Sequence, residues 1–458
     1  MKDVIRFYKY QIFPKCFKKT IIIPIHKNGS KCSVENYRPI AILPYFSKIF
    51  ERCLYNRLSQ FFNRYNLLSP DQFGFRKNLS TADALLSFME FQYDVLDSRE
   101  FSVNVLVDFT KAFDTVDHQI LLEKLDRYGI RGLPLALLKS YLSNRTQMVR
   151  VGQHCSSVRT SSVGVPQGSV LGPLLYLVYV NDLSHYINSD RTILFADDTN
   201  FCFRNTSLNS AISRCNLELQ KFYDWTLANK LTVNLDKTSY LIITNRNHPQ
   251  YSDPIMINNV EIQRTSSHKF LGITIDSNLK FDHHIKEISR KISKSAGILY
   301  RLSNYLPIAL MKNIYFSFVH SYLMYCNIIW GGTFNCHLQP LFRLQKRCIR
   351  IVNKVGYLEH TMPLFSSNEI LQLGDIHRFS VSCYVFRNLD DFPLNSNPYS
   401  TRNSLNLQSR FRRLTISQRS IYYSGPLNWN ALDNELKNVA EYHLFKSKLK
   451  RYFILTYL

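Results

Sequence analysis

The sequence predicts an α+β fold, in which short strands and amphipathic helices alternate along the chain. Apolar stretches of strand length, such as residues 21–25 and 103–107, end in polar or acidic residues. Other segments place apolar residues three or four positions apart, which is the period of an amphipathic helix. The chain has 458 residues, of which 45% are hydrophobic, so it is long enough for two or three domains with sizeable cores.

The first part of the chain mixes strands with helices. Residues 21–25 predict a strand, which ends in a turn cluster of His, Lys, Asn, Gly and Ser at 26–30. The region from 101 to 275 holds the other patterned strands. A helix from about 117 to 128 interrupts them, because apolar residues share one face and a glycine follows.

Two adjacent carboxylates lie at the tip of a predicted hairpin. Residues 193–203 are two apolar runs joined by Asp197-Asp198. Like charges repel, so we expect a positive group there, and a third acid, Asp108, ends the strand 103–107. Three carboxylates on two strand ends can hold two Mg²⁺ ions roughly 4 Å apart, a spacing that suits in-line phosphoryl displacement. The alternative interpretation of Asp-Asp is a solvated turn.

Two further helices are expected in this region. Gln167-Gly168 open a helix with Pro173 in its first turn, where the missing N–H of proline costs little. That helix is apolar on nearly all sides, so we expect it to be a buried, rigid mount for Gln167. Apolar residues recur every three or four positions between 208 and 222, which predicts an amphipathic helix on the back of the sheet.

Beyond Gly272 the sequence becomes helical and basic. A second basic helix begins near residue 338, and five of its cations share one face: Arg343, Lys346, Arg347, Arg350 and Lys354. Such a stripe favours a polyanion, and a solvated surface is the alternative. Residues 395–420, rich in Ser, Asn and Arg, predict an exposed linker before a terminal unit near 429–453.

The charge of the whole chain points to the same kind of partner. Lys and Arg number 57 against 34 Asp and Glu, a formal net charge of +23, which favours nucleic acid. An anionic membrane surface is the alternative. The longest strongly apolar run, 174–180, is far shorter than the roughly 18 residues of a spanning helix, so we expect no transmembrane segment.

Cysteine usage and the N-terminus bear on the compartment. The ten cysteines form no Cys-x-x-Cys pair and the N-terminus lacks an apolar signal core, so we expect an intracellular protein that is not secreted. Cys336-His337 with Cys326 and Cys348 match no common zinc-ligand spacing, so no zinc site is expected.

Three sequence blocks, in order, resemble motifs A, B and C of a reverse transcriptase. They are Val-Asp-Phe-Thr-Lys-Ala-Phe-Asp (107–114), Val-Pro-Gln-Gly-Ser (165–169) and Ala-Asp-Asp (196–198). The resemblance is to non-LTR, LINE-like retrotransposon polymerases of the jockey and CR1 type, and it is close over residues about 12 to 275.

Four more blocks extend this resemblance. Asn-Tyr-Arg-Pro-Ile (36–40) and Gln-Phe-Gly-Phe-Arg (72–76) are similar to the two finger motifs. Asn-Leu-Asp-Lys-Thr (234–238) is similar to motif D, and Lys-Phe-Leu-Gly-Ile (269–273) to the primer grip.

The resemblance implies a right-hand polymerase fold with a helical, basic C-terminal extension. Its expected divisions are fingers at 1–100, palm at 101–275, thumb at 276–335 and a basic C-terminal region at 336–458. Part of 118–160 is expected to pack with the fingers.

The implied activity is RNA-directed DNA polymerisation, in which dNTPs extend a DNA 3′-hydroxyl on an RNA template. Asp108, Asp197 and Asp198, with the backbone carbonyl of Phe109, would hold two Mg²⁺ ions, for which Mn²⁺ substitutes. Lys237 would protonate the leaving pyrophosphate.

The resemblance also implies a set of dNTP-binding residues. Lys27 and Arg38 would grip the triphosphate. Phe113 would exclude a 2′-hydroxyl, and Gln167 and Gly168 would face the incoming base pair. The alternatives are that Phe113 is simple core and that Lys27 is an ordinary surface lysine.

Template and primer are assigned to a finger arginine, the primer grip and the C-terminal stripe: Arg76, Phe270, Leu271, Gly272, Arg343, Lys346, Arg347 and Arg350. The resemblance also implies a partner in trans, either an element-encoded endonuclease, which would supply nicking, or a nucleic-acid-binding protein. It implies that the protein itself is nuclear, cytoplasmic or both. Telomerase-like and group II intron-like enzymes are sibling alternatives. A non-catalytic nucleic-acid-binding relic is the alternative from a different class.

Overall fold

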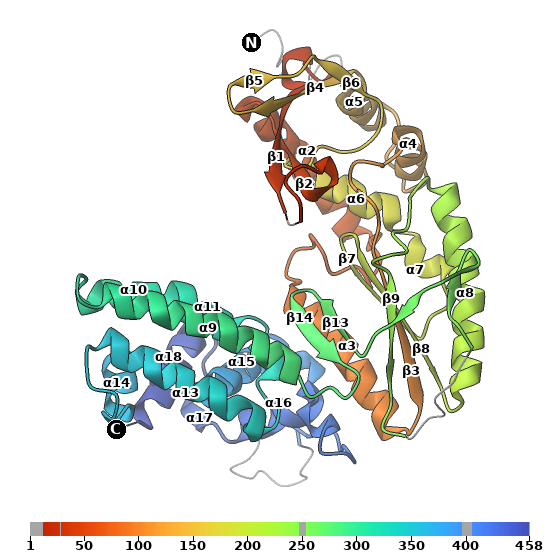
Figure 1. The fold of residues 1–458 in the computed structure, drawn as a ribbon. Coiled ribbons are helices and arrows are strands. Elements are labelled where there is room, and N and C mark those ends of the chain that lie inside the picture. The colour runs from red at the N-terminus through yellow and green to blue at the C-terminus, as the bar shows by residue number, and fades with distance from the viewer. Residues whose placement is uncertain (1–11, 28, 247–252, 396–404, 458) are drawn as a thin grey trace.

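The computed structural model describes residues 12–27, 29–246, 253–395 and 405–457. Two β-sheets with their helices form one half of the molecule, and a bundle of helices forms the other (Figure 1). The α+β prediction is confirmed. No helix in the described ranges combines the length and apolar character needed to cross a bilayer.

The first sheet combines strands from distant parts of the chain. β1 (Lys19–His26) pairs antiparallel with β2 (Tyr37–Ile42) and parallel with β4 (Arg145–Val151). The short strands β5 (His154–Cys155) and β6 (Arg159–Ser161) both pair with β4. Two short 3₁₀ turns, Lys15–Phe17 and Val34–Asn36, and the helices α2 (Tyr45–Arg64) and α5 (Leu133–Leu142) complete this part.

The second sheet has the strand order β12-β9-β3-β8-β7. Its members are β12 (Gln263–Arg264), β9 (Ser239–Ile243), β3 (Phe101–Val107), β8 (Asp198–Asn205) and β7 (Arg191–Phe195). Every residue of β3 is buried, because helices cover both faces of the sheet. The helix α8 (Leu208–Ala228) shares a hydrophobic cluster with one face and α3 (Thr81–Asp97) shares another with the opposite face. The predicted strand at 103–107 and the helix behind it are confirmed.

Three more helices pack in the cluster of α8. They are α4 (His118–Arg127), which Asp117 caps through its carboxylate, α6 (Gly172–Val180) and α7 (Leu183–Tyr186). Every residue of α6 except Pro173 is buried, as expected. The helix begins later than predicted, since Gly168 has a φ of +124° and the Ser169 hydroxyl accepts the Gly172 N–H at 2.9 Å. Gln167 and Gly168 therefore lie in the preceding loop.

The remaining structure is almost entirely helical. Two hairpins precede it, β10 (Met256–Ile257) with β11 (Val260–Glu261) and β13 (Ser267–Phe270) with β14 (Ile273–Asp276). The prediction of helix directly beyond Gly272 is therefore wrong for Ile273–Asp276, which form β14 before α9 begins. The helices are α9 (Asp282–Leu302), α10 (Ile308–Tyr315), a π-helical turn (Phe316–His320), α11 (Ser321–Met324), α12 (Asn327–Trp330), α13 (Asn335–Val352), α14 (Met362–Ser367), α15 (Leu373–Arg387), a 3₁₀ turn (Leu389–Asp391), another (Ser417–Arg419), α16 (Ile421–Asn430), α17 (Asn434–Lys437) and α18 (Tyr442–Leu455).

These helices share one hydrophobic cluster with α3. α13 packs along α9, so residues on both sides of position 335 contribute to the same core (Figure 1). Residues around 429–453 join that core as well.

Residues 412–420 are packed against α3, so the predicted exposed linker is wrong there, whereas Arg410 and Phe411 are exposed. Arg412 is only 4% exposed, and its guanidinium forms ion pairs with Glu90, Asp94 and Asp97 of α3. Burial raises the pKa of Glu90, and the Arg412 charge opposes that shift. The sequence composition of this segment gives no sign of its acidic partners on a distant helix.

Candidate active site

The strand register brings the three predicted acids to one edge of the second sheet. Asp108 follows the last residue of β3, and Val107 at its end pairs with Thr199 of β8. Asp198 is the first residue of β8 and pairs with Phe195, so Ala196 and Asp197 form the hairpin turn. The predicted hairpin is confirmed, but its turn lies one residue earlier than predicted, since Asp198 already belongs to the second strand.

The loop that precedes α3 holds this turn in place. The side-chain oxygen of Gln72 accepts the N–H groups of Gly74 and Ala196 at 2.8 and 3.1 Å. A Cβ on Gly74 would lie 2.4 Å from the Ala196 nitrogen, so only glycine permits this approach. Sequence reasoning missed Gln72, although it begins the second finger motif.

Arg76 belongs to the same loop. Its guanidinium donates to the carbonyl oxygens of Ser69 at 2.7 Å and Gln72 at 3.3 Å. The arginine therefore braces its own loop, and its contact with template stays a prediction.

The electrostatics of the acids favour a bound cation. Burial raises the pKa of Asp197, and burial together with the charges of Asp197 and Asp108 raises the pKa of Asp198 to about 6. Lys27 opposes both shifts and Arg38 opposes that of Asp197. A cation close by would stabilise the ionised forms.

The donor set fits a hard divalent cation, which prefers carboxylate and carbonyl oxygens. Within the described ranges, no group of three or more His, Cys, Asp or Glu side chains is arranged as a metal-binding cluster. Like charges repel one another, so a divalent cation would have to draw these carboxylates together.

A cavity of about 580 Å³ opens beside the acids. It collects most of the predicted catalytic and dNTP-binding residues, which come from both sheets and the loops between them: Lys27, Arg38, Asp108, Phe109, Phe113, Gln167, Gly168, Asp197 and Lys237. Asp198 is not part of its lining but interacts with Asp197 and Asp108. None of the predicted template and primer residues lines this cavity.

Lys237 lies beside the first acid. Its Nζ is 3.7 Å from Oδ2 of Asp108, and both side chains are solvent-accessible. The backbone N–H of Asn234 donates to the backbone carbonyl of Asp108 at 2.8 Å, and the backbone N–H of Asp108 donates to the Thr238 hydroxyl at 3.3 Å. The loop that carries Lys237 is therefore bound to the end of β3.

Phe113 is half-buried and lines the cavity. Its ring stacks on that of Tyr176 with centroids 4.4 Å apart and meets Phe75 edge-on at 6.3 Å. Tyr176 is fully buried on α6. Packing thus fixes a ring that also faces the cavity, a combination that periodicity alone did not predict.

The loop that carries Gln167 joins the two sheets. The Gln167 carbonyl accepts the Ala41 N–H at 2.8 Å, and Val165 donates to the Phe113 carbonyl at 2.8 Å. A Cβ on Gly168 would lie 2.6 Å from the Ala41 carbonyl oxygen. Glycine is required here both for this contact and for its positive φ.

The predicted primer grip is the β13–β14 hairpin. Leu271 and Gly272 form its turn with φ angles of +46° and +82°, and Tyr325 donates to the Leu271 carbonyl at 2.8 Å. Phe270 is buried and packs near Phe88 of α3. Its side chain supports the hairpin from the core, and contact of Leu271 and Gly272 with primer stays a prediction.

The basic stripe is shorter than predicted. α13 ends at Val352, so Lys354 lies beyond it, with a φ of +56°. Of the other four, Arg343 and Arg347 are exposed. The Lys346 ammonium lies 4.5 Å from the Phe342 ring centroid.

The last member of the stripe, Arg350, has neighbours of its own beyond the helix. It donates to the Glu359 carbonyl at 2.8 Å and lies over the Tyr357 ring. Arg343 and Arg347 are therefore the stripe residues most open to a partner.

The family described as "Reverse transcriptase (RNA-dependent DNA polymerase)" matches residues 25–275. The RNA-directed DNA polymerase from mobile element jockey of Drosophila melanogaster is 31% identical over 375 residues, which cover 79% of this chain and 40% of the relative. The probable RNA-directed DNA polymerase from transposon BS of the same species is 32% identical over 367 residues, covering 76% and 40%. The chain spans about two fifths of the length of these relatives.

Among solved structures, telomerase from Candida albicans, in complex with a fragment of telomeric RNA, aligns with a TM-score of 0.39 at 12% identity. The alignment covers 80% of this chain and 64% of that one.

Proposed function

Because this chain belongs to the reverse transcriptase family, we propose that it extends a DNA 3′-hydroxyl with dNTPs on an RNA template, as the polymerase part of a non-LTR retrotransposon. The α+β architecture is that of a right-hand polymerase. The observation that carries the proposal is the single cavity in which acids at strand ends meet cations, an aromatic ring and a glycine-containing loop.

We assign the fingers to 1–100, the palm to 101–275, the thumb to 276–335 and a basic region to 336–458. The parallel pairing of β4 with β1 supports the assignment of part of 118–160 to the fingers. The core that α9 and α13 share supports a thumb and C-terminal region that move as one body.

Asp108, Asp197 and Asp198, with the Phe109 carbonyl, would hold two Mg²⁺ ions or Mn²⁺ in their place. Bound there, the ions supply charge neutralisation and acidify the attacking hydroxyl. The protein contributes carboxylates at the ends of paired strands, which brings them to one edge of the sheet, where the ions would draw them into coordination.

Cations and an aromatic ring in the cavity would bind and select the nucleotide. Lys27 and Arg38 would bind the triphosphate, since both act on the Asp197 carboxylate across the cavity. Lys237, close to Asp108, would donate a proton to the leaving pyrophosphate. Phe113 would exclude the 2′-hydroxyl of an rNTP.

The template and primer would bind the tip of the β13–β14 hairpin and the exposed cations of α13. Arg343 and Arg347 would contact phosphates without reading the base sequence. Arg76 would act indirectly, through the loop that it braces.

Primer extension on an RNA template tests this function. We expect extension by the parent chain to require Mg²⁺ or Mn²⁺ and to fall by several orders of magnitude in Asp197→Asn. Asp126→Asn is the matched control, because Asp126 is exposed on α4 and pairs only weakly with Arg131, at 3.7 Å. If the folded parent binds primer–template but incorporates at the level of Asp197→Asn, the chain is a binding relic and the proposal fails.

A further inference from the structure

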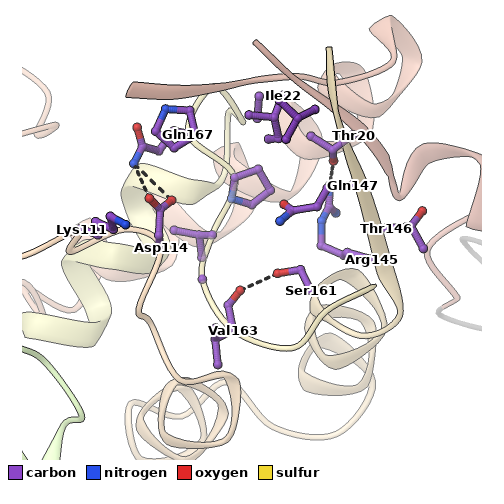
Figure 2. A pocket seen from close by; sticks show the side chains of 16 residues that line it. Thr20, Ile22, Lys111, Asp114, Arg145, Thr146, Gln147, Ser161, Val163 and Gln167 are labelled. Carbon is purple, nitrogen blue, oxygen red and sulfur yellow. Dashed lines mark hydrogen bonds between the residues drawn. The ribbon is translucent and has the colours of Figure 1, made fainter. Parts of the chain in front are cut away.

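A pair of polar side chains lines the proposed nucleotide site, and one of the two, Asp114, has no role in the account above. Asp114 is in the loop between β3 and α4, and Gln167 is in the loop before α6. The Gln167 amide nitrogen Nε2 donates to Oδ1 and Oδ2 of Asp114 at 3.2 and 3.1 Å (Figure 2). The two residues are 53 positions apart in the sequence.

The backbone around this pair is held independently of it. Gly164 donates to the Val116 carbonyl at 2.8 Å, and its own φ is +83°. A Cβ on Gly164 would lie 2.6 Å from the Asp114 carbonyl oxygen, so the two loops are in close contact. These backbone contacts hold the two loops together. The hydrogen bond to Asp114 therefore orients the Gln167 side chain and is not needed to set the backbone conformation.

The pair separates two cavities. Asp114 and Gln167 both line the cavity beside the acids and a second cavity of about 350 Å³. Figure 2 shows the second cavity, whose other walls include Thr20 and Arg145. A long glutamine side chain has several rotamers in such an open space, and some of them would place its amide in the second cavity.

The Asp114 carboxylate also determines which end of the Gln167 amide faces it. An ionised carboxylate only accepts hydrogen bonds, so the Gln167 NH₂ group must face it. The amide oxygen is then the atom left for another partner. An incoming nucleotide offers hydroxyl and amino donors for that oxygen.

We propose that Asp114 is a positioning residue, which keeps the Gln167 side chain at the boundary of the two cavities with its amide oxygen free to accept from the incoming nucleotide. This inference rests on the proposed polymerase function. It separates Asp114 from the metal-binding carboxylates and assigns it to nucleotide binding.

A double-mutant cycle in single-nucleotide incorporation tests the proposal. Asp114→Leu keeps the size of the side chain but removes the acceptor, so KM for the dNTP should rise about tenfold while kcat changes less than about twofold. Gln167→Ala should have the same effect. Because both changes remove one interaction, the double variant should be no worse than either single variant.

Asp114→Asn is the conservative variant, since its amide oxygen can still accept from Gln167. We expect its KM within about threefold of the parent. Asp126→Leu, a change of the same kind on the exposed face of α4, should leave KM unchanged. Thermal unfolding and primer–template affinity verify that each variant is folded, and Asp114→Ala replaces Asp114→Leu should the latter not fold.

Each outcome decides a separate question. Effects that multiply in the double variant, or an unchanged KM in Asp114→Leu, overturn the positioning role while the polymerase function stands. A change in kcat alone overturns it also, because Asp114 would then act on chemistry. A parent chain without incorporation overturns the proposed function and this inference together.

Discussion

Replacing Asp198 by Asn tests whether the three acids repel one another as their surroundings indicate. Burial and the charges of Asp197 and Asp108 raise the pKa of Asp198 to about 6, above the value of about 3.9 for an unfolded chain. Between these values the folded chain binds more protons than the unfolded chain. The free energy of unfolding therefore falls as pH rises from about 4 to about 6.

The size of the effect follows from the shift and from solvent access. A shift of about two units corresponds to about 3 kcal/mol, but Asp198 keeps an exposed surface and water screens its charge. We expect about 1 kcal/mol, which in a chain of this size raises Tm by about 2 °C or less.

The assay is thermal unfolding of the metal-free chain from pH 4 to pH 8. Asp198→Asn should melt above the parent at pH 8, the difference should shrink as pH falls below about 6, and it should be lost near pH 4, where the carboxyl is protonated in the folded chain and becomes protonated in the unfolded chain as well. Added Mg²⁺ should reverse the order, because the parent gains more from binding. The control Asp126→Asn should show no such pH dependence.

A metal-free Asp198→Asn chain that melts below the parent at pH 8 would refute the reasoning. So would a difference between the two chains that does not change with pH. Either result would mean that the Asp198 carboxylate is stabilised by the protein itself and has no need of a cation.

Other changes test the remaining parts of the account. Phe113→Ala should raise the ratio of rNTP to dNTP incorporation, because it opens space under the sugar; an unchanged ratio in an active variant would make the ring simple core. Changing Arg343 and Arg347 together to Gln should flatten the plot of log affinity against log salt by up to about two units, ~0.9 for each phosphate contact on a duplex. A slope equal to that of the parent would leave α13 as a solvated face or a protein-binding surface. Arg412→Met should lower the free energy of unfolding by about 1.5–3 kcal/mol, since Glu90, Asp94 and Asp97 lose the guanidinium that they share, and limited proteolysis near position 412 should accelerate; an unchanged cleavage rate would contradict that burial.

Local patterns in the sequence predicted the elements that carry the acids. The strand that ends at Asp108, the hairpin at 197–198 and the helix behind the sheet each have a period that short stretches reveal. The buried helix α6 was predicted for the same reason, although a glycine with positive φ delays its start.

Such local patterns could not predict the contacts between segments that are distant in the sequence. The parallel pairing of β4 with β1, the ion pairs of Arg412 with α3 and the hydrogen bond of Asp114 with Gln167 each depend on how the chain folds back. Lys354 shows a different limit, since its spacing continues a helical stripe but the helix has already ended. Sequence spacing predicts which residues share a face only within the bounds of the helix.

The central claim is that Asp108, Asp197 and Asp198 together form the metal site. Anomalous diffraction from Mn²⁺ in crystals of the chain with an RNA template, a chain-terminated DNA primer and the next dNTP tests it most directly. The account predicts two Mn²⁺ peaks roughly 4 Å apart, within coordination distance of these carboxylates, and the loss of at least one peak in Asp197→Asn. Mn²⁺ peaks bound elsewhere, or none at these carboxylates in a complex that holds the dNTP, would contradict it.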